Sequence, residues 1–194
     1  MNAIKSLESL PGVISHDKAS ILLVHGNLKP SALIVMEGPN FRDLKAPEHI
    51  ALTSLDTLNA IFSELSLSSV KKTEIMEARE SGSYVEVVRF FIARDISTAE
   101  KLKLLFDTVS VNHAEIGRLL GYPETAVTAF LTPRMLNQAD TPTSTKEVSE
   151  LNMRLLGHRL SKDNWQEEVK YLERSGEYIK SISPVIYDLV TAKE

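Results

Sequence analysis

The sequence predicts an α+β fold, in which a small, mainly antiparallel sheet of three or four strands with one covering helix precedes a helical C-terminal half. Short aliphatic runs bounded by turn residues occur at 20–24 and 32–36, and such runs are typical of buried strands. Two further β-rich segments flank Gly82, which suits a turn. From Ser97 onward, the apolar residues recur at helical spacing instead. These three observations define the predicted fold class.

Residues 1–95 are expected to form the sheet subdomain. A segment rich in glycine, asparagine and proline joins the first two strands, which predicts a hairpin between them. Residues 37–49 contain one glycine and two prolines and are expected to form an exposed loop. Ser54 is a suitable N-cap for a helix that runs to about Leu67, and the apolar side chains of this helix recur on one face. We expect that face to cover the sheet.

A second hairpin is predicted from two arms, 72–79 and 85–92, with its turn in the Ser-Gly-Ser sequence around Gly82. In the second arm, strict alternation breaks between Val87 and Phe90. This break predicts either a β-bulge or a strand that is buried on both faces. The pattern of the first arm is also compatible with a helix.

Residues 96–194 are expected to form the helical subdomain. Ser97 and Glu100 have the spacing of a capping box at the start of its first helix. The polar stretch 133–146 contains two prolines and predicts a linker or lid. In chain order, the expected elements are the helix from Ser97, a helical hairpin at 113–131, the linker, helices at 145–160 and 163–181, and a short apolar segment after Pro184.

The hairpin at 113–131, with the sequence HAEIGRLLGYPETAVTAFL, is the most informative stretch of the chain. Gly117 is small where two such helices cross closely, and Gly121 can adopt the left-handed conformation that ends a helix. Pro123 suits the first turn of the second helix, where its missing N–H is not needed. With its later apolar positions, this stretch resembles the helix-turn-helix family. That resemblance implies nucleic-acid binding through Arg118, Tyr122, Thr125 and Thr128.

The charge of the hairpin weakens this implication. Binding to DNA depends largely on basic groups that neutralise phosphates, whereas residues 123–131 contain no basic residue. The whole chain has a net charge of −4, from 22 basic and 26 acidic residues. Nucleic acid is therefore disfavoured as the main partner, and an atypical helix-turn-helix regulator is kept as an alternative.

The LLGYP fragment, followed by an alanine-rich helix, also resembles uncharacterised prokaryotic families that carry a GYP helical hairpin. Some of those families have cysteine after the GYP sequence. Here alanine and valine stand in that region, so the resemblance implies no thiol or metal chemistry. It implies no activity.

A second candidate site is the loop after the first predicted strand. His25 would lie at the strand end, followed by Asn27 and Lys29, and a histidine in such a loop is able to act as a general base near neutral pH. Arg89 and Arg94 would line an anion pocket with this loop if the strands are neighbours. The simpler interpretation is an ordinary turn, because no partner acid or nucleophile is fixed by the spacing.

Composition narrows the function classes. The 194-residue chain is 43% hydrophobic and contains no cysteine, which excludes thiolate catalysis and zinc–thiolate sites. The histidine spacing favours no metal site, and the chain has no phosphate loop, nucleophile motif or apolar segment long enough to span a bilayer. We expect a cytoplasmic, cofactor-free, non-catalytic protein-interaction module, whose partner is another protein or a second copy of the chain. The sequence leaves enzymatic activity open, and the alternatives are the regulator and a small-molecule binder or enzyme.

Overall fold

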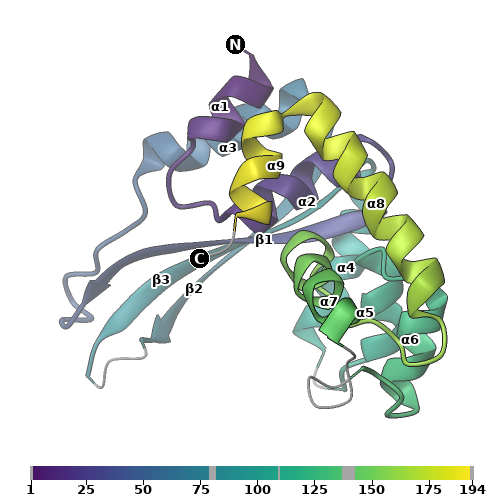
Figure 1. The fold of residues 1–194 in the computed structure, drawn as a ribbon. Coiled ribbons are helices and arrows are strands. Elements are labelled where there is room, and N and C mark those ends of the chain that lie inside the picture. The colour runs from purple at the N-terminus through teal and green to yellow at the C-terminus, as the bar shows by residue number, and fades with distance from the viewer. Residues whose placement is uncertain (1, 79–81, 109, 137–142, 193–194) are drawn as a thin grey trace.

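The computed structural model describes residues 2–78, 82–108, 110–136 and 143–192, and it confirms the α+β class (Figure 1). Its sheet has three antiparallel strands in the order β1-β3-β2. The strands are β1 (Ser31–Phe41), β2 (Ser68–Glu77) and β3 (Tyr84–Ala93). The helices of these described ranges are α1 (Ala3–Ser9), α2 (Ser15–His25), α3 (Leu52–Glu64), α4 (Ile96–Asp107), α5 (His113–Leu119), α6 (Glu124–Leu131), α7 (Thr143–Leu156), α8 (Trp165–Ile182) and α9 (Pro184–Thr191).

The predicted hairpin around Gly82 is present as β2 and β3, so the arm at 72–79 contributes to a strand and not to a helix. Ser81, in the predicted turn, lies outside the described residues. The central strand β3 is buried along most of its length, because it has a neighbour on each side and helices over both faces. A register shift does occur, but it lies in β1, between Glu37 and Asn40. The sequence left two explanations for the broken alternation in the arm 85–92, a β-bulge or burial on both faces. The structure shows burial on both faces of β3.

The prediction of a strand at 20–24 is wrong, because these residues belong to helix α2. Every α2 residue from Asp17 to Val24 is buried. The helix lies between β1 on one side and α7, α8 and α9 on the other. A helix that is buried all round shows no amphipathic period, so its apolar run cannot be told from a buried strand. The segment after it is consequently a helix-to-strand loop, and β1 extends to Phe41, into the region expected to be an exposed loop.

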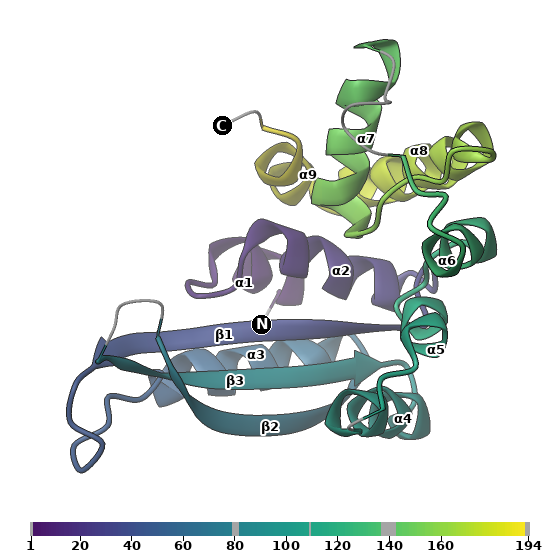
Figure 2. The same ribbon diagram turned by 90° about the horizontal axis from the view of Figure 1, so that it is seen from below.

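The two faces of the sheet carry different helices. Successive residues of a strand point to opposite faces. On one face, Phe90 packs against Phe62 of α3, with the ring centroids 5.6 Å apart. On the other, Phe91 packs against Phe106 of α4 at 5.7 Å. The expected covering helix is thus α3, and α1 and α2 share its face of the sheet (Figure 2).

The N-terminal caps of α3 and α4 differ from those predicted. The N-cap of α3 is Ala51, which offers no side-chain hydrogen bond, so Ser54 lies inside the helix. The N-cap of α4 is Asp95, whose carboxylate accepts a 2.9 Å hydrogen bond from the backbone N–H of Thr98. The Ser97 hydroxyl donates to the same carboxylate at 2.6 Å. Asp95 takes the cap because it lies directly before Ile96, the first residue of α4, where its carboxylate reaches the backbone N–H of Thr98.

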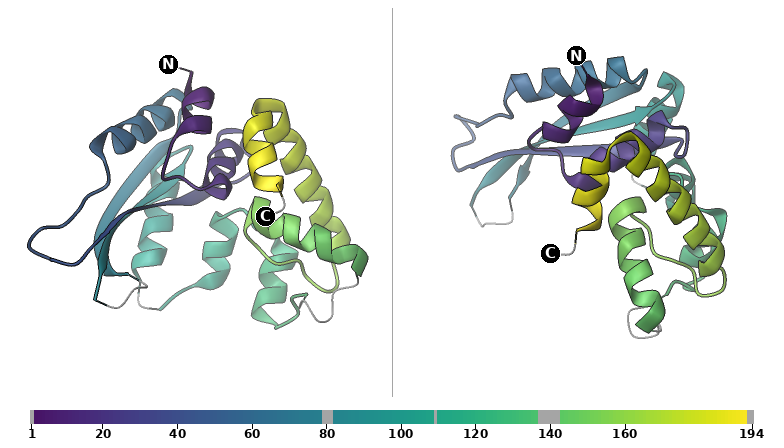
Figure 3. Two further views of the ribbon diagram at one scale, coloured as in Figure 1. Left: turned by 60° about the vertical axis from the view of Figure 1, so that its left-hand side comes forward. Right: turned by 45° about the horizontal axis from the view of Figure 1, so that its top comes forward.

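Helices α7, α8 and α9 of the helical half pack over α2, on the side that faces away from the sheet (Figure 3). The predicted helices at 145–160 and 163–181 correspond to α7 and α8, and Pro184 begins α9. Leu155, Leu172 and Ile186 belong to the same buried cluster as Ile21 and Ile34, so one core joins the two halves of the chain. Helices α4, α5 and α6 follow one another along one end of the sheet, up to the level of α8 (Figure 2). Residues 137–142 of the predicted linker lie outside the described residues, and its last residues, from Thr143 onward, belong to α7.

Candidate functional site

The helical hairpin forms as predicted, from α5 and α6. Gly121 has a φ of +77°, the left-handed conformation that favours glycine. A Cβ atom at Gly117 would lie 3.2 Å from Cγ2 of Val127, so this position requires a small residue where the helices cross. Pro123 is the N-cap of α6 and not its first residue. The predicted roles of Gly117 and Gly121 in the hairpin are thus confirmed, whereas Pro123 lies just before the second helix and not within it.

Three of the four residues that the helix-turn-helix resemblance assigned to nucleic acid make hydrogen bonds within the protein. Arg118 forms two with the Glu124 carboxylate, at 2.8 and 2.6 Å. The Tyr122 hydroxyl donates to the carbonyl of Gly157 at 3.2 Å, and the Thr125 hydroxyl donates to the Glu168 carboxylate at 2.7 Å. Thr128 is exposed and carries no charge. The charge on Arg118, the one basic residue of the four, is balanced by Glu124.

The five residues of the second candidate site do not converge. His25 has its Nδ1 atom 3.0 Å from the carbonyl oxygen of Leu65, and Asn27 has a positive φ of 58° in the loop that follows. Lys29 is buried and donates to the Ser20 hydroxyl at 3.3 Å. Arg89 projects from the sheet face opposite α2 and α3 and pairs with Glu74, while Arg94 is exposed. None of the five lines the apolar cleft that lies beside the hairpin.

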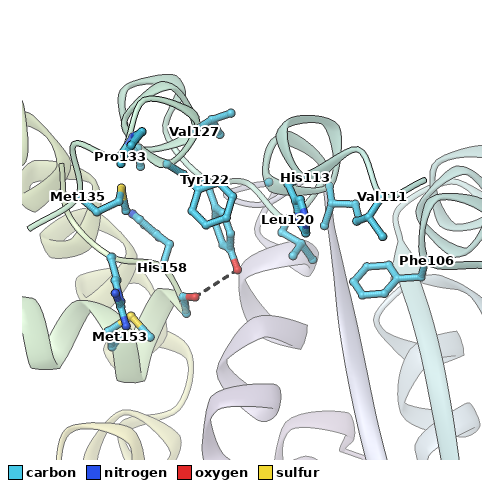
Figure 4. A pocket seen from close by; sticks show the side chains of 16 residues that line it. Phe106, Val111, His113, Leu120, Tyr122, Val127, Pro133, Met135, Met153 and His158 are labelled. Carbon is cyan, nitrogen blue, oxygen red and sulfur yellow. Dashed lines mark hydrogen bonds between the residues drawn. The ribbon is translucent and has the colours of Figure 1, made fainter. Parts of the chain in front are cut away.

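This cleft has a volume of about 810 Å³ (Figure 4). Phe106 and Val111 lie at one end, Met135 and Met153 at the other, and Tyr122 between them. Its walls come from the end of α4, the hairpin, the segment after α6, helix α7 and the turn that follows α7. The sixteen residues that line it are Phe106, Val111, His113, Ile116, Gly117, Leu120, Tyr122, Ala126, Val127, Phe130, Pro133, Met135, Met153, Gly157, His158 and Arg159.

The polar groups of the cleft are few. Of the sixteen lining residues, none is acidic, and those with polar side chains are His113, Tyr122, His158 and Arg159. The Tyr122 hydroxyl already donates to Gly157, and burial raises its pKa. Arg159 is exposed at the rim and forms no ion pair with a residue in the described ranges. The cleft thus combines an apolar lining with one unpaired permanent charge.

His158 is the most buried polar residue of the cleft, with 5% of its surface exposed. Its ring lies against that of Tyr122, with the centroids 4.9 Å apart. Neither ring nitrogen has a hydrogen-bond partner of ordinary geometry among the described groups. Burial, and secondarily the positive charge of Lys29, lower the pKa of His158 to about 4, against a weaker opposing effect of the Leu156 backbone. His158 is therefore a neutral imidazole at physiological pH, with an unused donor and an unused acceptor.

Buried and half-buried polar groups connect α2 to the neighbouring elements. The Asp17 carboxylate accepts a 3.0 Å hydrogen bond from the backbone N–H of Val35 on β1, and burial raises its pKa to about 6. Burial also lowers the pKa of Lys29 to about 8, although Asp17 opposes this shift. His16 has Nδ1 2.9 Å from the Arg154 carbonyl oxygen, and burial lowers its pKa. These groups lie inside the fold and bear on its stability.

Sequence reasoning missed the cleft because its walls come from segments that are far apart in the chain. The His158-Arg159 pair follows α7 after one residue, Gly157, and such a pair is usually explained by the favourable effect of positive charge at a helix end. Burial makes His158 neutral, so that explanation does not apply to it. The adjacent Gly157, with a φ of +78°, marks a sharp turn after α7 and is the one local signal for this part of the site.

No group of three or more acidic or histidine side chains in the described ranges is placed to hold a metal ion. Within the same ranges, every helix is too short or too polar to cross a membrane. In comparisons with known proteins, no family model, curated protein or solved structure matches this chain. The cleft is thus the feature on which a functional proposal depends.

Proposed function

We propose that this protein is a non-catalytic binding module whose apolar cleft takes up a small molecule. The observation that carries the proposal is the cleft itself, with a volume of about 810 Å³ and an apolar and aromatic lining. Small-molecule sites typically measure about 300–1,000 Å³ and combine such a lining with a few polar groups that fix the orientation of the ligand. Tyr122, His158 and Arg159 supply those groups here.

The chemistry of the lining favours binding over catalysis. A nucleophilic site needs a hydroxyl, thiol or amine within hydrogen-bonding reach of a base. Among the residues that line the cleft, the hydroxyl is that of Tyr122, and it donates to the Gly157 carbonyl. Burial makes His158 a poor base, because its pKa lies near 4. The described residues of the lining therefore lack the paired groups that acid–base or nucleophilic chemistry requires.

The proposal is tested with Nile red, an uncharged dye whose fluorescence rises in apolar surroundings. We expect saturable binding to the wild-type chain. Met153 and Met76 form a matched pair, because each is a methionine with 42% of its surface exposed but only Met153 lines the cleft. Met153→Trp fills part of the cleft and should weaken dye binding by about tenfold, a change of about 1.4 kcal/mol. Met76→Trp on β2 should leave the affinity unchanged.

Two outcomes would contradict the proposal. Wild-type protein that shows no saturable dye binding would indicate that the cleft does not take up apolar molecules. Equal effects of Met153→Trp and Met76→Trp would indicate that the dye binds elsewhere on the surface. Circular dichroism and thermal unfolding of both variants verify that the fold is retained.

A further inference from the structure

We infer that the ligand is a small amphipathic carboxylic acid, whose apolar body lies in the cleft and whose carboxylate pairs with Arg159. This inference rests on the proposed binding function and specifies the class of ligand. It depends on three features of the described residues: the charge of the lining, the fixed position of Arg159 and the difference between Arg159 and the neighbouring Arg134.

The charge of the cleft is opposite to that of the whole protein. The chain has a net charge of −4, yet no acidic residue is among the sixteen that line the cleft, and its permanent charge is the Arg159 guanidinium. A cationic ligand would find no counter-charge there. A neutral ligand would gain apolar contacts and ordinary hydrogen bonds, whereas an anion would also gain the stronger charge-assisted hydrogen bonds to Arg159. Charge complementarity therefore favours an anion.

The backbone around Arg159 is held at the rim of the cleft. The N–H of Leu136 donates to the carbonyl of Leu160 at 2.9 Å, and the N–H of Lys162 donates to the carbonyl of Arg134 at 2.9 Å. Met135 and Ser161 form an isolated antiparallel bridge between these two bonds. The side chains that flank Arg159 in sequence, His158 and Leu160, are buried. The backbone of Arg159 is thus fixed, while its side chain is exposed and able to reach a ligand.

The second arginine near this bridge already has a partner. Arg134 pairs with Asp163, with Nε 3.0 Å from the Asp163 carboxylate. Arg159 has no such partner among the residues that the structure describes. An arginine presents its N–H groups in a fork that matches the two oxygens of a carboxylate. The fork also matches phosphate oxygens, but a carboxylate carries the single negative charge that one unpaired guanidinium at the edge of an apolar cleft balances.

The test compares three probes of equal chain length: octanoate, octan-1-ol and octylamine. Each is titrated against Nile red bound to the wild-type chain at low salt. We expect octanoate to displace the dye at a concentration about tenfold lower than octan-1-ol, and octylamine to be the weakest competitor. Added salt should reduce the advantage of octanoate and leave octan-1-ol unaffected.

Arg159→Gln should bring octanoate to within about twofold of octan-1-ol, without changing the affinity for octan-1-ol. Arg94→Gln is the matched control, because Arg94 is also exposed but does not line the cleft, and it should preserve the preference for octanoate. Arg159→Lys keeps the charge but not the fork, and it should retain part of the preference.

The inference is overturned if the wild type binds octan-1-ol or octylamine as well as octanoate, or if Arg159→Gln keeps the preference for octanoate. In either case, displacement of Nile red would still support the proposed function. If Nile red does not bind to the wild type, the proposed function fails, and the inference fails with it.

Discussion

The Thr125 hydroxyl on α6 donates a 2.7 Å hydrogen bond to the Glu168 carboxylate on α8. This bond joins the second helix of the hairpin to α8, the longest helix among the described residues. Glu168 also accepts hydrogen bonds from the backbone N–H and the hydroxyl of Ser161, at 2.8 and 2.7 Å. Only 1% of the Glu168 surface is exposed, so these three donors replace the water that a carboxylate would otherwise bind. The contact secures the wall of the cleft that α6 provides.

We predict that Glu168→Ala destabilises the protein, because it leaves three donors without their acceptor. Hydrogen bonds to a charged group contribute about 1.5–3 kcal/mol each, and they are not additive. A loss of about 3 kcal/mol in the free energy of unfolding is therefore expected, measured by urea denaturation. Glu167→Ala is the control, since Glu167 is exposed and pairs only with Lys170 on the surface, and it should change stability by less than about 1 kcal/mol. Equal effects would contradict this assignment.

A comparison of two glycines tests the packing at the turn of the hairpin. Gly121 and Gly82 have nearly the same φ, +77° and +75°. A Cβ atom at Gly121 would lie 3.1 Å from Cγ of Lys29 and from Cδ of Pro30, whereas one at Gly82 would have no neighbour within 4 Å among the residues that the structure describes. Alanine at either site carries the backbone cost of about 1–2 kcal/mol for a left-handed residue. Gly121→Ala should therefore be the more destabilising variant in thermal unfolding, by about 1 kcal/mol or more. Similar losses would show that the contact with Lys29 relaxes freely.

The hairpin could be predicted because its signals are local. Gly121 must adopt a positive φ, and Gly117 must be small where α5 and α6 cross. Glycine at each position therefore indicates the local geometry directly. The β2–β3 hairpin could be predicted for a similar reason. Helix α2 could not, because its burial depends on α7, α8 and α9, which follow it by more than a hundred residues. A run of apolar residues shows that a segment is buried, without showing which element buries it.

The cleft lies beyond sequence reasoning for the same physical reason. Phe106, Tyr122 and Met153 line one cavity, but they belong to three separate segments. Nothing in the local pattern places them together. His25 is the opposite case, because the sequence suggested it as a site residue and the structure places it away from the cleft. Its Nδ1 atom lies 3.0 Å from the Leu65 carbonyl oxygen. A residue with suitable chemistry at a suitable position can therefore serve the fold alone.

The buried amine of Lys29 predicts an increase in stability at alkaline pH. Its pKa in the folded protein is about 8, below the ordinary value of 10.5. Between these values the unfolded chain binds a proton that the folded protein does not, so the free energy of unfolding rises with pH. The shift corresponds to a gain of up to about 3 kcal/mol between pH 8 and pH 10.5. Urea denaturation across this range should show the rise in the wild type.

Lys29→Met should remove most of that rise, because methionine has no proton to lose. A smaller rise should remain, because burial also lowers the pKa of Lys18. Lys170→Met is the control, since it also replaces a lysine by methionine but at an exposed position, where no buried amine is removed. It should show the same alkaline rise as the wild type. If Lys29→Met followed the wild-type curve, the increase would have to come from another group, and the burial of this amine would have no measurable consequence.

The neutral imidazole of His158 predicts the opposite trend in acid. Its pKa is about 4 in the folded protein, below the ordinary value of 6.5. Between these values the unfolded chain binds the proton, so stability is lost as the pH falls from about 6.5 to about 4, by up to about 3 kcal/mol. His158→Phe keeps an aromatic ring beside Tyr122 and removes the titration. Because the other acid-titrating groups remain in both proteins, the variant should gain stability relative to the wild type as the pH falls.

The control is His113→Phe, which replaces an exposed histidine of the same cleft and should leave the acid loss in place. A constant difference between His158→Phe and the wild type from pH 7 to pH 4 would mean that His158 is protonated as easily in the folded protein as in the unfolded chain, and that this side of the cleft is open to water.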